Sequence, residues 1–343
     1  MKRGLFALLV TASCGSAIAC DITLSAGGNI QTALNTSGVT EVCLSSGSYP
    51  VTSTLAIPAN KHLRGLGATM DSVVLISSAN RTVSMGNNTR LRNLKIQAAS
   101  GYTPEYGILA HQKSNVTLWD LKVQGNKINV GLNQCTTVHV WNVFMSMNGT
   151  SSSAAEPNMW INSSNTVDIQ WGEALGRNNG PGGDGEIATY NSSGVSIYGT
   201  YVTNSGASAI YMVNCDDCSV TNATITRAGE WGLDIVQGSD DFFADSNSIA
   251  LSRWGGSVFD GVNNTNGLYV DNVFTNNNTG GYGPYCNGIN YSGSASSFVA
   301  TGSTGGGTLL CGSIALRVEG ALLDRSLCGS VAGWNLSSRR LWA

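Results

Sequence analysis

The sequence predicts an all-β solenoid, a fold in which short strands stack in successive turns of the chain. A five-residue phrase recurs eight times between residues 107 and 292, and its second residue is apolar every time. Alternation of this kind is the pattern of a strand with one buried face. The second residues, which we expect to point inward, are Ile108, Val130, Met159, Ile187, Ile210, Leu233, Val258 and Ile289.

A second phrase recurs in step with the first. Its leading inward positions are Thr89, Val116, Val138, Val167, Val195, Cys218, Phe242 and Leu268, spaced 22 to 29 residues apart. Seven residues after each stands another small or apolar residue, namely Ile96, Val123, Met145, Ala174, Val202, Ile225, Ile249 and Thr275. A fixed period in this range indicates stacked repeats. A β-sandwich, the alternative, gives no reason for apolar columns in register over eight units.

The N-terminus has the pattern of a secretory signal peptide. Lys2 and Arg3 precede an apolar run over residues 5–10, and Ala17-Ile18-Ala19 supplies a small-x-small cleavage site. We therefore assign residues 1–19 to the signal, 20–302 to the solenoid and 303–343 to a C-terminal cap or poorly defined tail. The expected location is secreted or periplasmic, and no later segment is long and apolar enough to span a membrane.

Composition excludes several classes of protein. Charged residues make up 11 % of the chain and its formal net charge is −3, which leaves no electrostatic footprint for nucleic acid. The 42 % of hydrophobic residues, placed in register, argue against disorder. We expect a monomer.

Eight cysteines remain after the signal, an even number that fits disulfides in an exported protein. We expect Cys20 to pair with Cys43, and Cys286 with Cys311. Two alternatives stay open: a lipid on Cys20, since Ala-Ile-Ala-Cys weakly resembles a lipobox, and zinc at Cys215-Asp-Asp-Cys218. The second lacks a further Cys or His pair at ligand spacing.

Residues 27–34 predict one or two helical turns, because Ile30 and Leu34 share a face. A helix here would cover the open end of a solenoid, which otherwise exposes apolar rungs and unpaired strand edges.

The segment "NIQTALNTSGVTEVCLSSGSYPVTSTLAIPANKHLRGLG" resembles the entry cap and first turns of the right-handed parallel β-helix, pectate-lyase-like superfamily. "SNVTLWDLKV", "SGVSIYGTYV" and "CSVTNATI" resemble its later rungs. The resemblance covers roughly residues 25–300. It implies a single-domain right-handed parallel β-helix with an N-terminal cap helix.

The same resemblance leaves function open, because the superfamily includes lyases, glycoside hydrolases, epimerases, esterases, tailspikes and adhesins. The Asn-Thr-Asp, Asp-Asp and Gly-His-Gly series of polygalacturonases is absent, as are the signature motifs of mannuronan epimerases and classical pectate lyases. No catalytic residue is therefore carried over. Cofactors stay unknown: calcium is compatible with the fold, but the chain has no motif for it and we assign no metal ligands.

Outward positions of the first phrase predict a candidate groove. Stacked strands lie about 4.8 Å apart, so equivalent residues form columns. Aromatic faces, carboxylates and amides in such columns suit a polysaccharide. The candidate catalytic residues are Glu186, Tyr190, Tyr211 and Asp234, and the candidate substrate-binding residues on the strands are His111, Trp160 and Asn162.

Three arginines, Arg177, Arg227 and Arg253, begin long loops that enter this sheet. They are candidates for binding the carboxylates of an acidic sugar, or for pairing with acidic residues of the chain. Asp260 falls in the inward column with Ile161, Met212 and Ile235, where an unpaired carboxylate is costly. We favour a slip of the register at Gly261, and the alternative is that Asp260 is hydrogen-bonded inside.

Two reactions compete. In β-elimination from a uronic acid, an arginine neutralises the carboxylate and a residue such as Tyr211 moves protons. In hydrolysis, two carboxyl groups such as Glu186 and Asp234 act as acid and base. The prediction is a secreted protein that binds and cleaves an extracellular polysaccharide, and the alternative is a non-catalytic adhesin or surface-binding solenoid.

Overall fold

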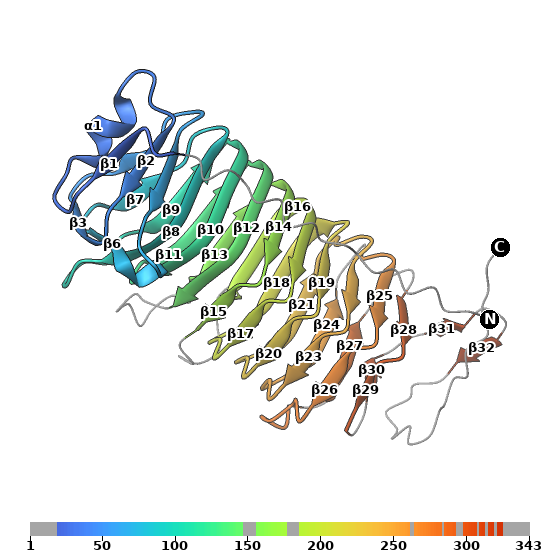
Figure 1. The fold of residues 1–343 in the computed structure, drawn as a ribbon. Coiled ribbons are helices and arrows are strands. Elements are labelled where there is room, and N and C mark those ends of the chain that lie inside the picture. The colour runs from blue at the N-terminus through green and yellow to red at the C-terminus, as the bar shows by residue number, and fades with distance from the viewer. Residues whose placement is uncertain are drawn as a thin grey trace, which may run out of the picture.

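The chain is a parallel β-solenoid of about 10 turns in this computed structural model (Figure 1). The structure describes residues 19–146, 156–176, 185–260, 264–282, 285–292, 298–306, 309–312, 315–318 and 321–324. Residues 1–18 of the proposed signal peptide lie outside the described residues. All pairings along the solenoid are parallel, as expected when each strand returns to the same place one turn later.

Each turn contributes to three sheets. The first sheet contains β4 (Leu55–Ala56), β7 (Arg81–Ser84), β9 (Tyr106–His111), β11 (Ile128–Asn133), β13 (Met159–Asn162), the start of β16 (Ile187–Tyr198), β18 (Ile210–Asp216), β21 (Trp231–Val236), β24 (Gly255–Asp260), β27 (Ile289–Ser292) and β30 (Leu310–Gly312). The second contains β1 (Ile22–Leu24), β2 (Glu41–Leu44), β5 (His62–Gly65), the start of β8 (Thr89–Ala98), β10 (Ser114–Gln124) and β12 (Thr136–Ser146), then β14 (Asn165–Gln170), the end of β16, β19 (Ser219–Thr221), β22 (Phe243–Asp245), β25 (Gly267–Val270) and β28 (Phe298–Thr301).

The third sheet contains β3 (Gly47–Val51), β6 (Val73–Ser77), the ends of β8, β10 and β12, then β15 (Glu173–Leu175), β17 (Tyr201–Thr203), β20 (Thr224–Thr226), β23 (Ser248–Ala250), β26 (Val273–Thr275) and β29 (Thr304–Gly305). The long strands β8, β10 and β12 therefore run around the corner between the second and third sheets. Side chains that alternate inward from all three sheets fill the interior.

The inward columns are confirmed over most of the solenoid. In the first sheet Ile108, Val130, Met159, Ile187, Ile210 and Leu233 pair in series and all are fully buried. In the second sheet the series runs from Thr89 through Val195, and in the third from Ile96 through Ile249. Stacking of equivalent residues produces one continuous apolar core along the axis.

The prediction is wrong by one residue in the turn that begins at β24. Ser257, not Val258, pairs with Leu233, and Phe274, not Thr275, pairs with Ile249. Large rings cause the shift. Phe259 points inward, with its ring centroid 6.5 Å from that of Phe242.

The same shift reaches the second sheet, where Gly267 replaces Leu268 in the inward column and Leu268 is exposed. A Cβ on Gly267 would lie 2.9 Å from the Phe259 ring, so this position accepts no side chain. Asp260 consequently points outward beside Val236, as a shifted register predicts.

The corners explain the abundance of asparagine and glycine. At the corner between the second and third sheets the backbone is left-handed in nearly every turn, at Asn93, Asp120, Asn142, Trp171, Gly199, Asn222, Ser246, Asp271 and Gly302. Among residues with a side chain, Asn and Asp adopt this conformation most readily. Sharp corners without helices are therefore encoded by residue type.

The N-terminal end of the solenoid carries the helix α1 (Ile30–Asn35) (Figure 1), and the short 3-10 helix η1 (Met70–Ser72) packs against β6, β8 and β10. The Asn29 side chain accepts from the Thr32 amide, and Ile30 and Leu34 are buried. At the other end, β29 and β30 continue the parallel pairing beyond residue 302. The strands β31 (Ala315–Val318) and β32 (Ala321–Asp324) form a separate antiparallel pair.

The disulfide between Cys20 and Cys43 is confirmed. Because the Cys20 sulfur is bonded to Cys43, it cannot also carry a lipid thioether. Cys215 and Cys218 also form a disulfide, which replaces the alternative of zinc at that pair. The pairing of Cys286 with Cys311 stays a prediction.

Candidate functional site

The outer face of the first sheet brings most of the predicted site residues together. Trp160, Ala188, Tyr211 and Asp234 occupy equivalent outward positions on four successive turns. A parallel column formed by His111, Asn133, Asn162 and Tyr190 runs beside them. Ala188 is fully buried between the Trp160 and Tyr211 positions, which lie about two strand spacings, roughly 10 Å, apart.

Hydrogen bonds and ring contacts hold both columns in place. Asn162 Nδ2 donates to Asn133 Oδ1, and the Asn133 amide contacts His111 Nδ1, each at 3.0 Å. The Tyr190 and Tyr211 rings meet edge to face with their centroids 5.8 Å apart. This surface therefore presents amides and aromatic rings at fixed positions, as a sugar-binding groove requires.

Asp234 is a carboxyl group on this face whose pKa is strongly raised. It is 8 % exposed, and Ser208 Oγ donates to its Oδ2 at 2.7 Å. Burial raises the pKa of Asp234 to about 7, and the charges of Glu230 and Asp260 add to this effect against the hydrogen bond from Ser208. A carboxyl group that is half protonated near neutral pH can act as a general acid.

Glu186 lies in the corner between the third and first sheets instead of on the outer face. Asn126, Asn129 and Asn158 form a ladder of side-chain hydrogen bonds inside this corner, and Asn158 Nδ2 donates to Glu186 Oε2 at 2.6 Å. Burial raises the pKa of Glu186 to about 7, opposed by Asn158, the Ser205 hydroxyl and the Gly206 amide. Glu186 thus ends a ladder of asparagines.

One short loop touches both buried acids. Ser205 and Gly206 stabilise the Glu186 carboxylate, while Ser208 donates to Asp234. Ser205 Oγ also donates to the Ser208 carbonyl at 2.8 Å, which closes the loop on itself. Residues 205–208 therefore place the Ser208 hydroxyl against Asp234. Sequence reasoning missed this serine, because nothing in the repeat marks it.

Asp260 is a second carboxyl group on this face, which the sequence did not mark as a site residue. It is half-buried, points outward from β24, and lies one turn and two strand positions from Asp234. Strand spacing and rise put the two α-carbons about 8 Å apart. In the sequence, only a shift of register could indicate that Asp260 lies on the outer face instead of in the interior.

Aromatic residues cluster at the corner between the third and first sheets, where the strand that carries Asp234 begins. Trp231 begins the strand that carries Asp234, and its ring centroid is 4.7 Å from Tyr285 and 6.1 Å from Trp254. The Arg253 guanidinium lies 5.4 Å from the Tyr282 ring centroid. Arg227 is exposed at the corner after β20, and Arg177 lies outside the described residues.

The described residues lack two signatures, that of a metal site and that of a membrane-spanning helix. That part of the chain holds no group of three or more His, Cys, Asp or Glu that could bind a metal ion. No helix within it is long and apolar enough to cross a membrane.

Comparison with known proteins supports the fold. No family model matches the sequence. No curated protein matches it either. Among solved structures, the catalytic domain of a GH87 α-1,3-glucanase in complex with nigerose is similar over 81 % of this chain, with TM-score 0.56 and 13 % identity. This chain spans 56 % of that structure.

Two further structures resemble the chain. The A-module of the mannuronan C-5 epimerase AlgE4 from Azotobacter vinelandii is similar over 85 % of this chain and 88 % of its own, with TM-score 0.51 and 15 % identity. The Dettilon tailspike protein is similar over 77 % and 60 %, with TM-score 0.50 and 12 % identity. These proteins are right-handed parallel β-helices, and the chain described here has the same fold.

Proposed function

We propose that this protein is an exported glycoside hydrolase that binds a neutral extracellular polysaccharide along the outer face of the first sheet. The observation that carries the proposal is the pair Asp234 and Asp260. One carboxyl group is buried with its pKa raised to about 7, and the other is half-buried on the same face. An unequal pair of this kind matches the acid and base of glycoside hydrolysis.

The roles follow from the two environments. Asp234, kept partly protonated by burial, would donate a proton to the glycosidic oxygen. Asp260 would activate water from the opposite side of the bond. Inverting hydrolases hold their two carboxyl groups about 6.5–9.5 Å apart, and the α-carbon separation of about 8 Å allows this. Trp160 and Tyr211 would bind the sugar rings on one side of the scissile bond.

The charge distribution favours a neutral substrate over a uronic acid polymer. Residues 128–300 contain three Lys and Arg against fourteen Asp and Glu, and the candidate groove lies among these turns. Such a field repels a polyuronate. The GH87 structure similar to this chain belongs to an α-1,3-glucanase, so α-1,3-glucan is the first polysaccharide to test.

A specific observation keeps β-elimination as the second candidate. The Tyr190 and Tyr211 rings are in edge contact on the same face, so their hydroxyl groups are candidates for moving protons in a lyase reaction. Arg227 and Arg253 are the two described cations within the acidic turns at residues 128–300, and Arg253 packs on Tyr282.

Incubation with α-1,3-glucan, β-glucans and polyuronates tests the proposal. New reducing ends from a neutral glucan, lost in Asp234→Asn and retained in Asp245→Asn, are the expected result. Asp245 is a suitable control because it is a half-exposed acid on the second sheet. Unsaturated uronate products would favour elimination instead. Binding without any product would favour the adhesin.

A further inference from the structure

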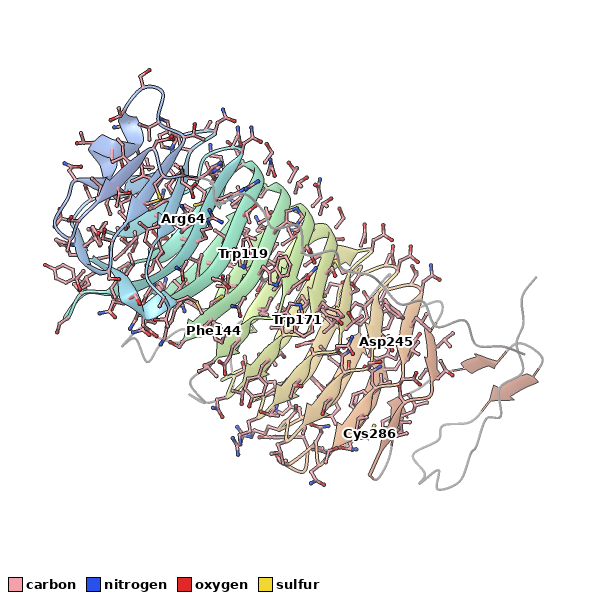
Figure 2. All side chains as sticks on the ribbon, viewed as in Figure 1. Arg64, Trp119, Phe144, Trp171, Asp245 and Cys286 are labelled. Carbon is pink, nitrogen blue, oxygen red and sulfur yellow. A yellow bond between two sulfur atoms is a disulfide. The ribbon has the colours of Figure 1, made fainter. Side chains whose placement is uncertain are left out.

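A second candidate site lies on the second sheet near the N-terminal end of the solenoid. A depression of about 400 Å³ is lined there by Arg64, Leu66, Arg92, Asn93, Trp119 and Asp120. Arg64, Arg92 and Trp119 occupy equivalent outward positions on three successive turns. In Figure 2, Arg64, Trp119, Trp171 and Asp245 follow one another along the long axis.

Trp119 presents one face to this depression. Its other face is stacked on Trp141, with ring centroids 5.6 Å apart and planes inclined by 17°. Stacking along the axis directs the remaining face toward the turn of Arg92. Trp119 is 39 % exposed, so part of its ring surface is accessible to a ligand.

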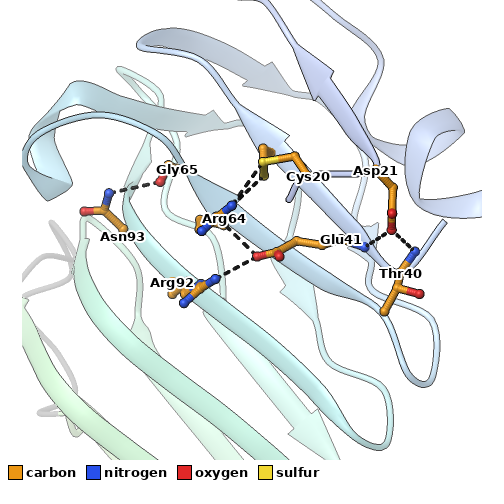
Figure 3. The surroundings of a disulfide bond; sticks show 9 residues. Cys20, Asp21, Thr40, Glu41, Arg64, Gly65, Arg92 and Asn93 are labelled. Atoms are coloured by element: carbon orange, nitrogen blue, oxygen red, sulfur yellow. Dashed lines mark hydrogen bonds and ion pairs between the residues drawn. A yellow bond between two sulfur atoms is a disulfide. The ribbon is translucent and has the colours of Figure 1, made fainter. Parts of the chain in front are cut away.

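A buried carboxylate holds the two guanidinium groups. Glu41 is 2 % exposed, and its Oε1 lies 3.2 Å from Arg64 Nε and 2.9 Å from Arg92 Nη2 (Figure 3). Arg64 Nη2 also contacts the sulfurs of the Cys20–Cys43 disulfide at 3.1 and 3.4 Å.

The surrounding charge is opposite to that of the candidate groove. Residues 20–127 contain nine Lys and Arg against five Asp and Glu, and exposed Arg90 extends from the same strand as Arg92. Within the depression Asp120 adds a negative charge, and its Oδ1 accepts from Asn142 Nδ2 at 2.6 Å. The positive field therefore comes from this whole end of the solenoid, and Asp120 is placed to accept hydrogen bonds from hydroxyl groups.

We propose that this depression binds an anionic sugar residue of an acidic glycan, separately from the groove on the first sheet. The C–H face of the pyranose stacks on Trp119, its carboxylate meets Arg64 and Arg92, and a hydroxyl donates to Asp120. Such a site would hold the protein on an acidic polymer while the acidic groove accepts a neutral one. Binding at this depression does not depend on the reaction proposed for the groove.

Calorimetric titration with tetragalacturonate, and with cellotetraose as a neutral probe, tests the inference. We expect tetragalacturonate to bind more tightly than cellotetraose and to weaken as salt is raised. Trp119→Ala should weaken tetragalacturonate binding at least tenfold, whereas Trp171→Ala should not. Trp171 is the matched control because it is 50 % exposed and lies outside the depression.

Leu66→Glu provides an independent test, because Leu66 is 45 % exposed and an added carboxylate there repels the anion without loss of packing. Unchanged binding in both variants, or equal affinity for the two tetrasaccharides, would overturn the inference. Asp234→Asn should bind tetragalacturonate as the parent does, and Trp119→Ala should retain hydrolysis of soluble glucan oligosaccharides. The two sites can therefore fail separately.

Discussion

Asp234 and Asp260 lie on adjacent turns of the same outer sheet face, yet Asp234 is 8 % exposed and Asp260 is half-buried. The difference arises from the loop at residues 205–208, whose Ser208 hydroxyl contacts Asp234. One carboxyl group is therefore desolvated while its neighbour keeps contact with water. This inequality supplies the acid and the base from two identical side chains.

Replacing the proposed acid should remove turnover without unfolding the protein. Asp234→Asn keeps the size of the side chain and an oxygen that accepts from Ser208, but it cannot donate a carboxylic proton. We expect kcat/KM for the cleaved glucan to fall by on the order of 10²–10⁴. Reducing-end assays measure this, and a melting temperature equal to that of the parent excludes unfolding. Near-parental activity would contradict the assignment.

The pH profile should report the buried acid. Since Asp234 must be protonated to act, and burial raises its pKa to about 7, the rate should fall as the pH rises through about 7. The Glu230 charge raises this pKa further, so Glu230→Gln should lower it and move the alkaline limb of kcat/KM to lower pH. A limb that stays in place in the variant would show that another group controls the rate.

Stability should also depend on pH through the buried acids. Burial raises the folded-state pKa of Glu186 from its ordinary value of 4.5 to about 7, so the folded protein binds more protons than the unfolded chain between these values. The free energy of unfolding should therefore decrease as the pH rises from about 4.5 to 7, by about 3 kcal/mol for this group.

Glu186→Gln removes the titration of the Glu186 carboxyl group. The melting temperature of this variant should therefore decrease less between pH 5 and pH 8 than that of the parent. The test compares how steeply the melting temperature falls with pH in the two proteins. Absolute melting temperatures are not compared, because Gln places an amide against the donors that now contact the carboxylate. Equal slopes in the two proteins would mean that Glu186 keeps an ordinary pKa in the fold.

Tyr211→Phe distinguishes the two reactions. If the protein is a hydrolase, Tyr211 binds the sugar through its ring, and loss of the hydroxyl should change kcat/KM less than about tenfold. If it is a lyase, loss of a proton-transferring hydroxyl should cost about 10²-fold or more. The edge contact with Tyr190 does not require the hydroxyl, so folding should be retained.

The N-terminal disulfide should contribute to stability but not to turnover. Cys20→Ser opens a loop between residues separated by 23 positions, and we expect a loss of about 3 kcal/mol. Chemical denaturation measures this loss. Because each turn contacts only its neighbours, activity at the turn of Asp234 should be unchanged below the new melting temperature. A large loss of activity would contradict this separation.

The architecture could be predicted from the repeat alone, because a buried column requires an apolar residue at the same place in every turn. Ile108 and Leu233 illustrate this, and the outward column of Trp160, Tyr211 and Asp234 followed from the same register. The disulfide between Cys20 and Cys43 was also predictable from its place directly after the predicted signal peptide.

Tertiary structure decided which side chains of β24 point inward and how deeply individual carboxyl groups are buried. Val258 and Phe259 are both apolar, so hydrophobicity could not tell which one points inward, and only the fit of the Phe259 ring against Gly267 does. Glu186 and Asp234 differ in direction because strand position sends one into a corner and the other outward. Loops that are distant in sequence determine the burial of each acid, and a repeat pattern contains no information about them.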